Sequence, residues 1–199
     1  MTEVKQQDHI AMLHNVRLAF AQLWTAKQVN NDGKAAFSAA FLMTPDHPDI
    51  AALRAIISQV AAAKWGVDGA ETLKILIAGD RICLRNGDAK ANYDGFAGNM
   101  YVSSRSPSRP LVIAQDRSAL AESDGKPYSG CFVNAQIAVW AQQNTHGKRI
   151  NAQLRGVQFL RDGDAFGGGG VAQPDEFDVV EGAGADAEAP VVGDEWGLT

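Results

Sequence analysis

The chain has 199 residues, of which 46% are apolar and 21% are charged, and its formal net charge is -5. This length and apolar content suffice for one hydrophobic core with a small appendage. No apolar run approaches the roughly 18 residues of a membrane helix, and the first residues, MTEVKQQDH, lack the basic and apolar regions of a signal peptide, so we expect a soluble protein that is not exported.

Charge is unevenly distributed along the chain. From Pro174 to Thr199 there are eight acids and no Lys or Arg, which leaves 15 acids against 18 bases in residues 1–173, a net charge of +3. Between Lys74 and Arg161 there are twelve bases and six acids, a net charge of +6. A basic body with an acidic tail is compatible with binding of an anion such as nucleic acid, which an evenly spread charge of -5 would disfavour.

The first part of the chain predicts a β-hairpin. Residues 12–24 alternate in polarity and give a strand with one apolar face. The turn cluster from Asn30 to Gly33 contains Asp-Gly, a strong hairpin signal, and is followed by a second strand at 34–43. Within that strand Phe37 and Phe41 share a face, either in the protein interior, which we favour, or as a pair that stacks on bases.

A helix is predicted from about residue 46 to residue 64. The segment 46–49, Asp-His-Pro-Asp, places capping and acidic residues and a proline at a helix start. Ile50, Leu53, Ile56, Ile57 and Val60 form an apolar stripe, and Gly66 ends the helix. We expect this helix, including its lone histidine, to be structural.

The stretch after the helix predicts short strands at 73–78 and 81–85, followed by a turn at 86–88. In residues 93–109, Tyr93, Phe96 and Tyr101 are interleaved with glycines and serines and lie near Arg105 and Arg109. A flexible backbone, stacking rings and cations favour contact with nucleic acid. The alternative is a solvated loop between strands.

Residues 128–161 predict two long strands joined by a polar turn from Asn144 to Gly147. One face of the first strand reads as core and consists of Cys131, Val133, Ala135, Ile137 and Val139. The other face carries Tyr128, Phe132, Asn134, Gln136 and Trp140, and the return strand adds Lys148, Arg149, Arg155 and Arg161. Rings, amides and cations are the groups that a single-stranded nucleic acid requires. The same alternation is equally compatible with a strand face that is covered by a helix or a loop. In that case Phe132 and Trp140 would be core residues.

Other motifs indicate no catalytic or metal site. Cys83 and Cys131 lie in apolar strand contexts without a CxxC pattern, so buried reduced thiols are predicted. Gly167 to Gly170 lacks the Lys-Ser/Thr of a phosphate-binding loop and is expected to be a hinge. We therefore predict a protein that is not an enzyme, with no cofactor and no metal.

Several blocks, in order, resemble a family of bacteriophage single-stranded-DNA-binding proteins. They are LHNVRLAFAQLW, KAAFSAAFLMTPD with the helix after it, LRNGD, YSGCFVNAQIAVWAQQN and GVQFLRDGDAFGGGG with DEF beyond, and they span Leu13 to Phe177. The resemblance implies an OB-fold, a five-stranded Greek-key barrel that binds single strands, followed by an acidic tail. We expect a mainly β domain with one helix in residues 1–166, and a glycine hinge with a disordered acidic tail in residues 167–199.

The expected function is sequence-tolerant binding and protection of single-stranded DNA during phage DNA replication or recombination, in the cytoplasm of the bacterial host. The candidate DNA-binding residues are Tyr93, Tyr101, Arg105, Arg109, Tyr128, Phe132, Asn134, Gln136, Trp140, Lys148, Arg149 and Arg155. The alternatives are a strand-annealing recombination protein and a metal-dependent nuclease. The sequence leaves the oligomeric state open, a homo-oligomer included.

The last residues of the tail place an aromatic and an aliphatic side chain after two acids. They resemble the acidic, hydrophobically tipped tails by which single-strand-binding proteins dock replication partners. The predicted partner-binding residues are Asp194, Glu195, Trp196 and Leu198. We also expect the acids to compete with DNA for the basic part of the chain when no partner is bound.

Overall fold

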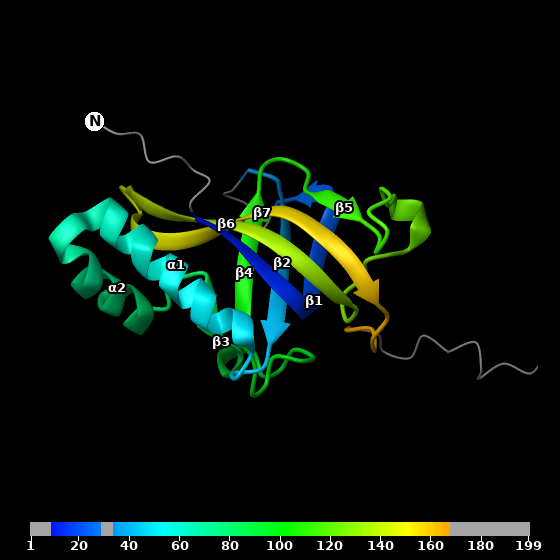
Figure 1. The fold of residues 1–199 in the computed structure, drawn as a ribbon, viewed down its shortest axis with the longest axis horizontal. Coiled ribbons are helices and arrows are strands. Elements are labelled where there is room, and N and C mark those ends of the chain that lie inside the picture. Colours follow the sequence, from blue (N-terminus) through cyan, green and yellow to red (C-terminus); the bar gives the residue numbers. More distant parts are fainter. Residues whose placement is uncertain (1–8, 29–33, 168–199) are drawn as a thin grey trace, which may run out of the picture. The chain divides into compact units, whose positions relative to one another are not determined.

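A single sheet that closes on itself forms the framework of the molecule, and two helices lie at one end of it (Figure 1). The computed structural model describes residues 9–28 and 34–167. The strands are β1 (Ile10–Lys27), β2 (Ala36–Met43), β3 (Leu84–Asn86), β4 (Met100–Ser106), β5 (Leu111–Ile113), β6 (Phe132–Asn144) and β7 (Gly147–Arg161). The helices are α1 (Pro48–Trp65) and α2 (Gly69–Ala78).

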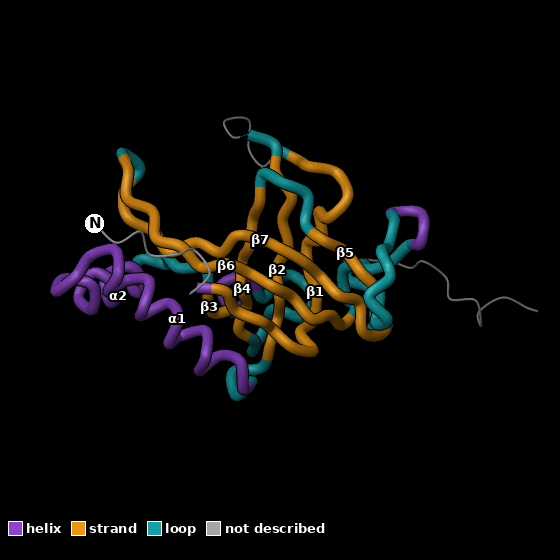
Figure 2. The backbone as a smooth tube through the Cα atoms, turned by 45° about the horizontal axis from the view of Figure 1, so that its top comes forward, coloured by secondary structure: helices purple, strands orange, loops and turns teal. Residues whose placement is uncertain are grey.

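Five of the strands make a closed barrel (Figure 2). The sheet order is β3-β4-β2-β1-β6-β7-β5, and an additional pairing of β4 with β7 closes the ring. Neighbours in the ring are antiparallel except β4 and β7, which run parallel and meet at Ser104 and Ala152. The OB-like five-stranded barrel expected from the family resemblance is thereby confirmed.

Strand β1 pairs with two neighbouring strands, and it bends at two bulges. Its first half, from Ile10 to Arg17, pairs with β6, and its second half pairs with β2. The register shifts near Asn15 and Phe20, and both residues have a left-handed backbone, with φ of 49° and 50°. Bulges bend a strand and redirect a side chain, so β1 can curve around the barrel.

The barrel interior follows the alternation of β6. Val133, Ile137 and Val139 are at most 2% exposed, as the sequence pattern predicted. Cys83 and Cys131 are buried free thiols, which confirms that prediction. Burial raises the pKa of Cys83 to about 12 and that of Cys131 to about 11.

Helix α1 covers one end of the barrel, as predicted. Its N-cap is His47, whose Nδ1 accepts a hydrogen bond from the Asp49 N–H over 3.2 Å. Ile50, Leu53 and Val60 are at most 3% exposed and belong to the same core as the barrel interior. The apolar stripe of α1 therefore seals the barrel.

The strand predicted at residues 73–78 is wrong, because these residues belong to α2. Leu73 and Leu76 pack against the core, whereas Ile75 and Ile77 are 65% and 55% exposed. A short apolar run is compatible with either a strand or a helix. Here the run forms a helix, which packs its leucines against the core at the end of the barrel. By length and hydropathy Pro48–Ala78 could cross a membrane, but a 3-10 turn at Gly66–Asp68 interrupts it and its apolar stripe packs into the core.

The flexible backbone expected for residues 93–109 is partly wrong, because Met100–Ser106 forms β4, a barrel strand. Serine is not typical of a buried strand, yet Ser104 is only 3% exposed. Its hydroxyl donates to the Ala39 carbonyl over 3.0 Å. This long-range hydrogen bond satisfies the buried hydroxyl and could not be seen in the local pattern.

Candidate nucleic-acid interface

A groove of about 520 Å³ opens where β4 leaves β3 and approaches β7. Its walls come from the start of β2, from β3 and β4, and from the β6–β7 hairpin. The lining residues are Lys34, Ala35, Ala36, Ile82, Cys83, Arg85, Ser103, Ser104, Arg105, Pro107, Trp140, Gln142, Ile150, Asn151 and Ala152. OB-folds bind oligonucleotides on the second and third barrel strands and the flanking loops, and β2, β4 and the β6–β7 hairpin occupy those positions here.

Within the described residues, the groove lining contains three cations and no carboxylate. The cations are Lys34, Arg85 and Arg105. The Arg105 guanidinium donates to the backbone carbonyl of Lys34, which ties β4 to the residues before β2. Arg85 donates to the Ile82 carbonyl over 2.8 Å, and its ion pair with the exposed Asp80 spans 3.5 Å. An exposed pair of this kind is weak, so the groove favours an anionic ligand.

Trp140 supplies an aromatic ring to the groove. It lies on the outer face of β6, because Val139 points into the barrel, and it is 43% exposed. Its partner across the strand pair is Asn151, whose Nδ2 donates to Gln142 Oε1 over 3.1 Å. An exposed ring beside cations matches the bases and phosphates of a single strand.

The tip of the β6–β7 hairpin is fixed to the helices. Trp65 Nε1 donates to Gln143 Oε1 over 2.7 Å. Lys148 Nζ lies 5.4 Å from the centre of the Trp65 ring and 3.5 Å from the Thr72 hydroxyl. Lys148 therefore anchors the hairpin and does not line the groove, and its expected role as a phosphate contact stays a prediction.

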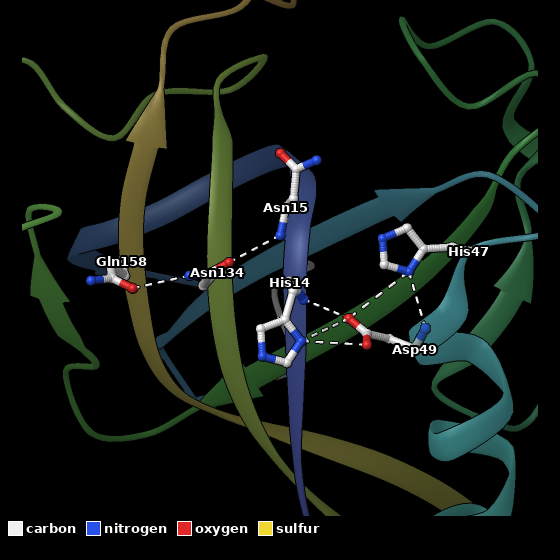
Figure 3. A network of polar contacts seen from close by, with 6 residues as sticks. All are labelled: His14, Asn15, His47, Asp49, Asn134 and Gln158. Carbon is white, nitrogen blue, oxygen red and sulfur yellow. Dashed lines mark hydrogen bonds and ion pairs between the residues drawn. The ribbon is translucent and has the colours of Figure 1, made fainter.

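The amides on the outer face of β6 hold the sheet together (Figure 3). Asn134 Oδ1 accepts from the Asn15 N–H, and its Nδ2 donates to Gln158 Oε1, both over 3.0 Å. Gln136 Oε1 accepts from Arg155 Nε over 3.1 Å. These hydrogen bonds join β1, β6 and β7, and the expectation that Asn134 and Gln136 also contact base edges stays a prediction.

Tyr128 and Phe132 are half-buried and pack against the segment after β7. Two guanidinium groups lie near the Phe132 ring, with Arg161 Cζ 3.5 Å and Arg17 Cζ 5.7 Å from its centre. The Tyr128 hydroxyl donates to the Asp162 carboxylate over 3.0 Å, and partial burial raises the pKa of Tyr128. Neither ring lines the groove, and their expected role in stacking on bases stays a prediction.

The tyrosines of the 93–101 stretch lie at different depths. Tyr101 is 3% exposed, and its ring packs 5.1 Å from that of Phe96. It therefore cannot stack on a base, which corrects that expectation. Tyr93 is 47% exposed on the loop before β4. Arg109 stacks over the Trp24 ring, 5.1 Å from its centre, and does not line the groove.

Comparison with known proteins identifies the family. Residues 9–189 match the family described as Enterobacter phage Enc34, ssDNA-binding protein. The chain belongs to this family. Putative protein p50 of Acyrthosiphon pisum secondary endosymbiont phage 1 is 48% identical to the chain over 169 residues, which cover 83% of this chain and 91% of that protein.

Solved structures of the Enc34 protein share the fold of this chain. The structure of the single-stranded DNA-binding protein from bacteriophage Enc34 in complex with ssDNA is 25% identical, with a TM-score of 0.70, and covers 84% of this chain and 97% of that one. A second structure of the Enc34 protein is 26% identical, with a TM-score of 0.66, over 89% and 97% of the two chains. The single-stranded DNA-binding protein encoded by bacteriophage T7, at 14% identity, a TM-score of 0.53 and coverage of 90% and 98%, shares the fold alone.

Of the candidate residues named from the sequence of this Enc34-family protein, the structure brings Trp140 and Arg105 into the groove. Arg149 lies across from Gln142, which lines the groove. Sequence reasoning missed Lys34 and Arg85, although both follow or precede a recognised turn signal. The sequence around a single basic residue does not show which residues lie near it in the folded protein. Lys34 and Arg85 line the same groove only because the barrel closes.

Other predictions for this family member fall elsewhere. Asp194, Glu195, Trp196 and Leu198 lie outside the described residues. Within residues 9–28 and 34–167, no group of three or more His, Cys, Asp or Glu side chains is placed to hold a metal ion.

Proposed function

We propose that this chain binds single-stranded DNA in the groove between β4 and the β6–β7 hairpin. The observation that carries the proposal is an exposed Trp140 beside Lys34, Arg85 and Arg105, at the position where OB-folds bind oligonucleotides. Family membership and the ssDNA complex of the Enc34 protein support it.

Different side chains of the groove bind different parts of the DNA. A base stacks on Trp140, and the cations contact phosphates, with Ser103 and small alanines letting the backbone approach closely. Stacking tolerates any base, because every base has a π-face, so binding has little sequence preference. Bases in a duplex are already stacked and paired, so duplex DNA binds more weakly.

In the cell, binding of this kind covers exposed single strands during phage DNA replication or recombination, in the cytoplasm of the bacterial host. The acidic tail serves a second purpose in this proposal. Trp196 and Leu198 dock on a replication protein, and the eight acids of the tail compete with DNA when no partner is bound.

Titration of the intrinsic tryptophan fluorescence with single-stranded and duplex oligonucleotides, at two salt concentrations, tests the DNA-binding proposal. Single strands quench the fluorescence and bind more tightly at low salt. Trp140→Phe keeps a stacking ring but removes most of the quenching, which assigns the signal to the groove. Equal affinity for duplex DNA, or full quenching in Trp140→Phe, refutes the proposal.

The tail is tested separately by truncation and by substitution. Truncation after Ala172 tightens binding to single-stranded DNA, most strongly at low salt, because it removes an internal competitor. Replacing only Trp196 and Leu198 by alanine leaves DNA affinity unchanged and abolishes pull-down of a phage or host replication protein. Unaltered DNA affinity after truncation, or retained pull-down, contradicts the respective part.

A further inference from the structure

The β6–β7 hairpin extends past the barrel as a two-stranded arm (Figure 1). In the described part of the chain, β1 accompanies β6 only as far as Ala138, and β7 meets β4 only at Ala152. The arm therefore consists of residues 139–144 and 147–151, which pair with each other and with no other described strand. An isolated two-stranded hairpin is only marginally stable in water, so the arm needs support from another element.

The two faces of the arm have different neighbours. Side chains alternate along a strand, so Trp140 and Gln142 share one face of β6 and Gln143 belongs to the other. On the first face, Trp140, Gln142 and Asn151 line the groove. Asn151 Nδ2 donates to Gln142 Oε1, and Gln142 Nε2 donates to Asn144 Oδ1, both over 3.1 Å. These bonds join the groove side chains of the arm to each other, so the position of the arm determines the position of Trp140.

The opposite face of the arm is held by α1 and by the segment after α2. Trp65, the last residue of α1, donates from Nε1 to Gln143 Oε1 over 2.7 Å. Lys148, the cross-strand partner of Gln143, has its Nζ 5.4 Å from the centre of the Trp65 ring. The Ile150 N–H donates to the Arg81 carbonyl over 3.0 Å. One tryptophan side chain therefore contacts both strands of the arm.

Trp65 connects the arm to the rigid part of the molecule. Its ring is partly buried and packs against the hydrophobic core that the barrel shares with α1. Gln143, by contrast, is exposed and lies next to the turn of the arm. The hydrogen bond between the two side chains therefore fixes the free end of the arm to the core of the protein.

We propose that Trp65 is a positioning residue for DNA binding, which holds the arm through Gln143 so that Trp140 faces a base in the groove. This inference rests on the proposed function. An arm without this bond occupies several orientations, and only some of them place Trp140 in the groove. The apparent affinity falls in proportion to the fraction of molecules that are competent to bind.

The test uses Gln143→Met, which removes the acceptor without changing the charge or much of the length of the side chain. A hydrogen bond of this kind is worth about a two- to tenfold change in an equilibrium constant. Binding of a labelled oligothymidylate of about 16 nucleotides, the upper site size of an OB-fold, weakens by about this factor. The salt slope is unchanged, because no phosphate contact is lost. Trp65→Phe weakens binding similarly, and the double variant binds no more weakly than Trp65→Phe.

Hydrogen exchange measured by NMR shows whether the arm has moved. The Ile150 N–H bonds Arg81 outside the β6–β7 ladder, so its exchange in Gln143→Met accelerates by about two- to tenfold. The Leu18 N–H, which donates to the Cys131 carbonyl in the barrel, keeps its rate. Gln143→Glu, the matched control for exchange, retains an acceptor for the indole N–H and leaves the Ile150 rate as in the wild type.

A second background separates positioning from stability alone. In Trp140→Ala protein, Gln143→Met causes no further loss of affinity, because the ring that the arm positions is absent. Wild-type affinity in Gln143→Met, or an equal loss with and without Trp140, shows that the contact only stabilises the arm and overturns this inference. If Trp140→Ala itself binds oligothymidylate like the wild type, the groove proposal fails as well.

Discussion

Replacing Trp140 by alanine removes the ring that we place under a DNA base. One stacked base is worth about 1–3 kcal/mol, so the dissociation constant for single-stranded DNA rises by about 5- to 150-fold. The ring is 43% exposed, so a little more than half of its surface is covered by protein. With about 250 Å² for a fully buried ring and about 25 cal/mol per Å², the substitution costs at most about 4 kcal/mol of unfolding free energy.

These two losses are measured separately. Anisotropy of a labelled oligonucleotide at 25 °C reports binding, and thermal melting without DNA reports stability. Trp140→Phe retains a ring and is expected to bind within a few-fold of wild type. A Trp140→Ala protein that melts at a much lower temperature but, while folded, binds DNA normally would place the ring in the core and refute the reasoning.

Further predictions concern the charge of Arg105, the backbone conformation at Gly130 and the thiol of Cys83. Arg105→Ala weakens binding to all DNA sequences alike and lowers the salt slope by about 0.7, whereas Arg54→Ala, on the exposed side of α1 and outside the groove, changes neither quantity in the same titrations. Gly130→Ala lowers the unfolding free energy by more than about 3 kcal/mol in denaturant titrations, because its φ is 109° and a Cβ would collide with the Asp164 carbonyl. Gly98→Ala, with φ of 71° and open space around it, costs only about 1 kcal/mol, and equal losses for the two variants would contradict this account. Burial raises the pKa of Cys83 from 9.0 to about 12, so the folded state holds this proton more tightly than the unfolded state. Its contribution to stability is complete below pH 9 and declines as the pH rises toward 12, and denaturant titrations of Cys83→Ala should show a weaker decline than wild type over that range.

Elements with a local signal were predicted well from the sequence. The predicted hairpin strands are present as β1, which ends at Lys27, and β2, which begins at Ala36, and the polar turn before Gly147 separates β6 from β7. His47 and Pro48 mark the start of α1, and Gly66 marks its end. In each of these cases the physical cause lies within a few residues of its effect.

Elements that depend on distant partners were missed or misplaced. The apolar run of α2 does not distinguish helix from strand, and the choice depends on the barrel end that it covers. Strand β4 looked like a loop because Ser104 finds its hydrogen-bond partner, Ala39, on another strand. The groove combines Lys34, Arg85 and Trp140, which no sequence window contains together.

The amide side chains of β6 illustrate a different limit of prediction from the sequence. Alternation placed Asn134 and Gln136 on the outer face correctly, but exposure of a strand face does not show whether its polar groups are free. Their hydrogen bonds are made to Asn15, Gln158 and Arg155. Composition therefore indicated which kinds of polar group lie on this face, whereas only the structure showed which neighbouring strands these amides join.

The position of β1 between β2 and β6 also determines the order in which the chain can fold. The Asn15 N–H bonds Asn134, 119 positions further along. Until β6 and β7 have been synthesised, β1 has β2 as its neighbour on one side and an unpaired edge on the other. Closure of such distant pairs is slow, on the order of milliseconds to seconds for barrels of this kind. The nascent protein must therefore keep its first strand from pairing with other chains until β6 has left the ribosome.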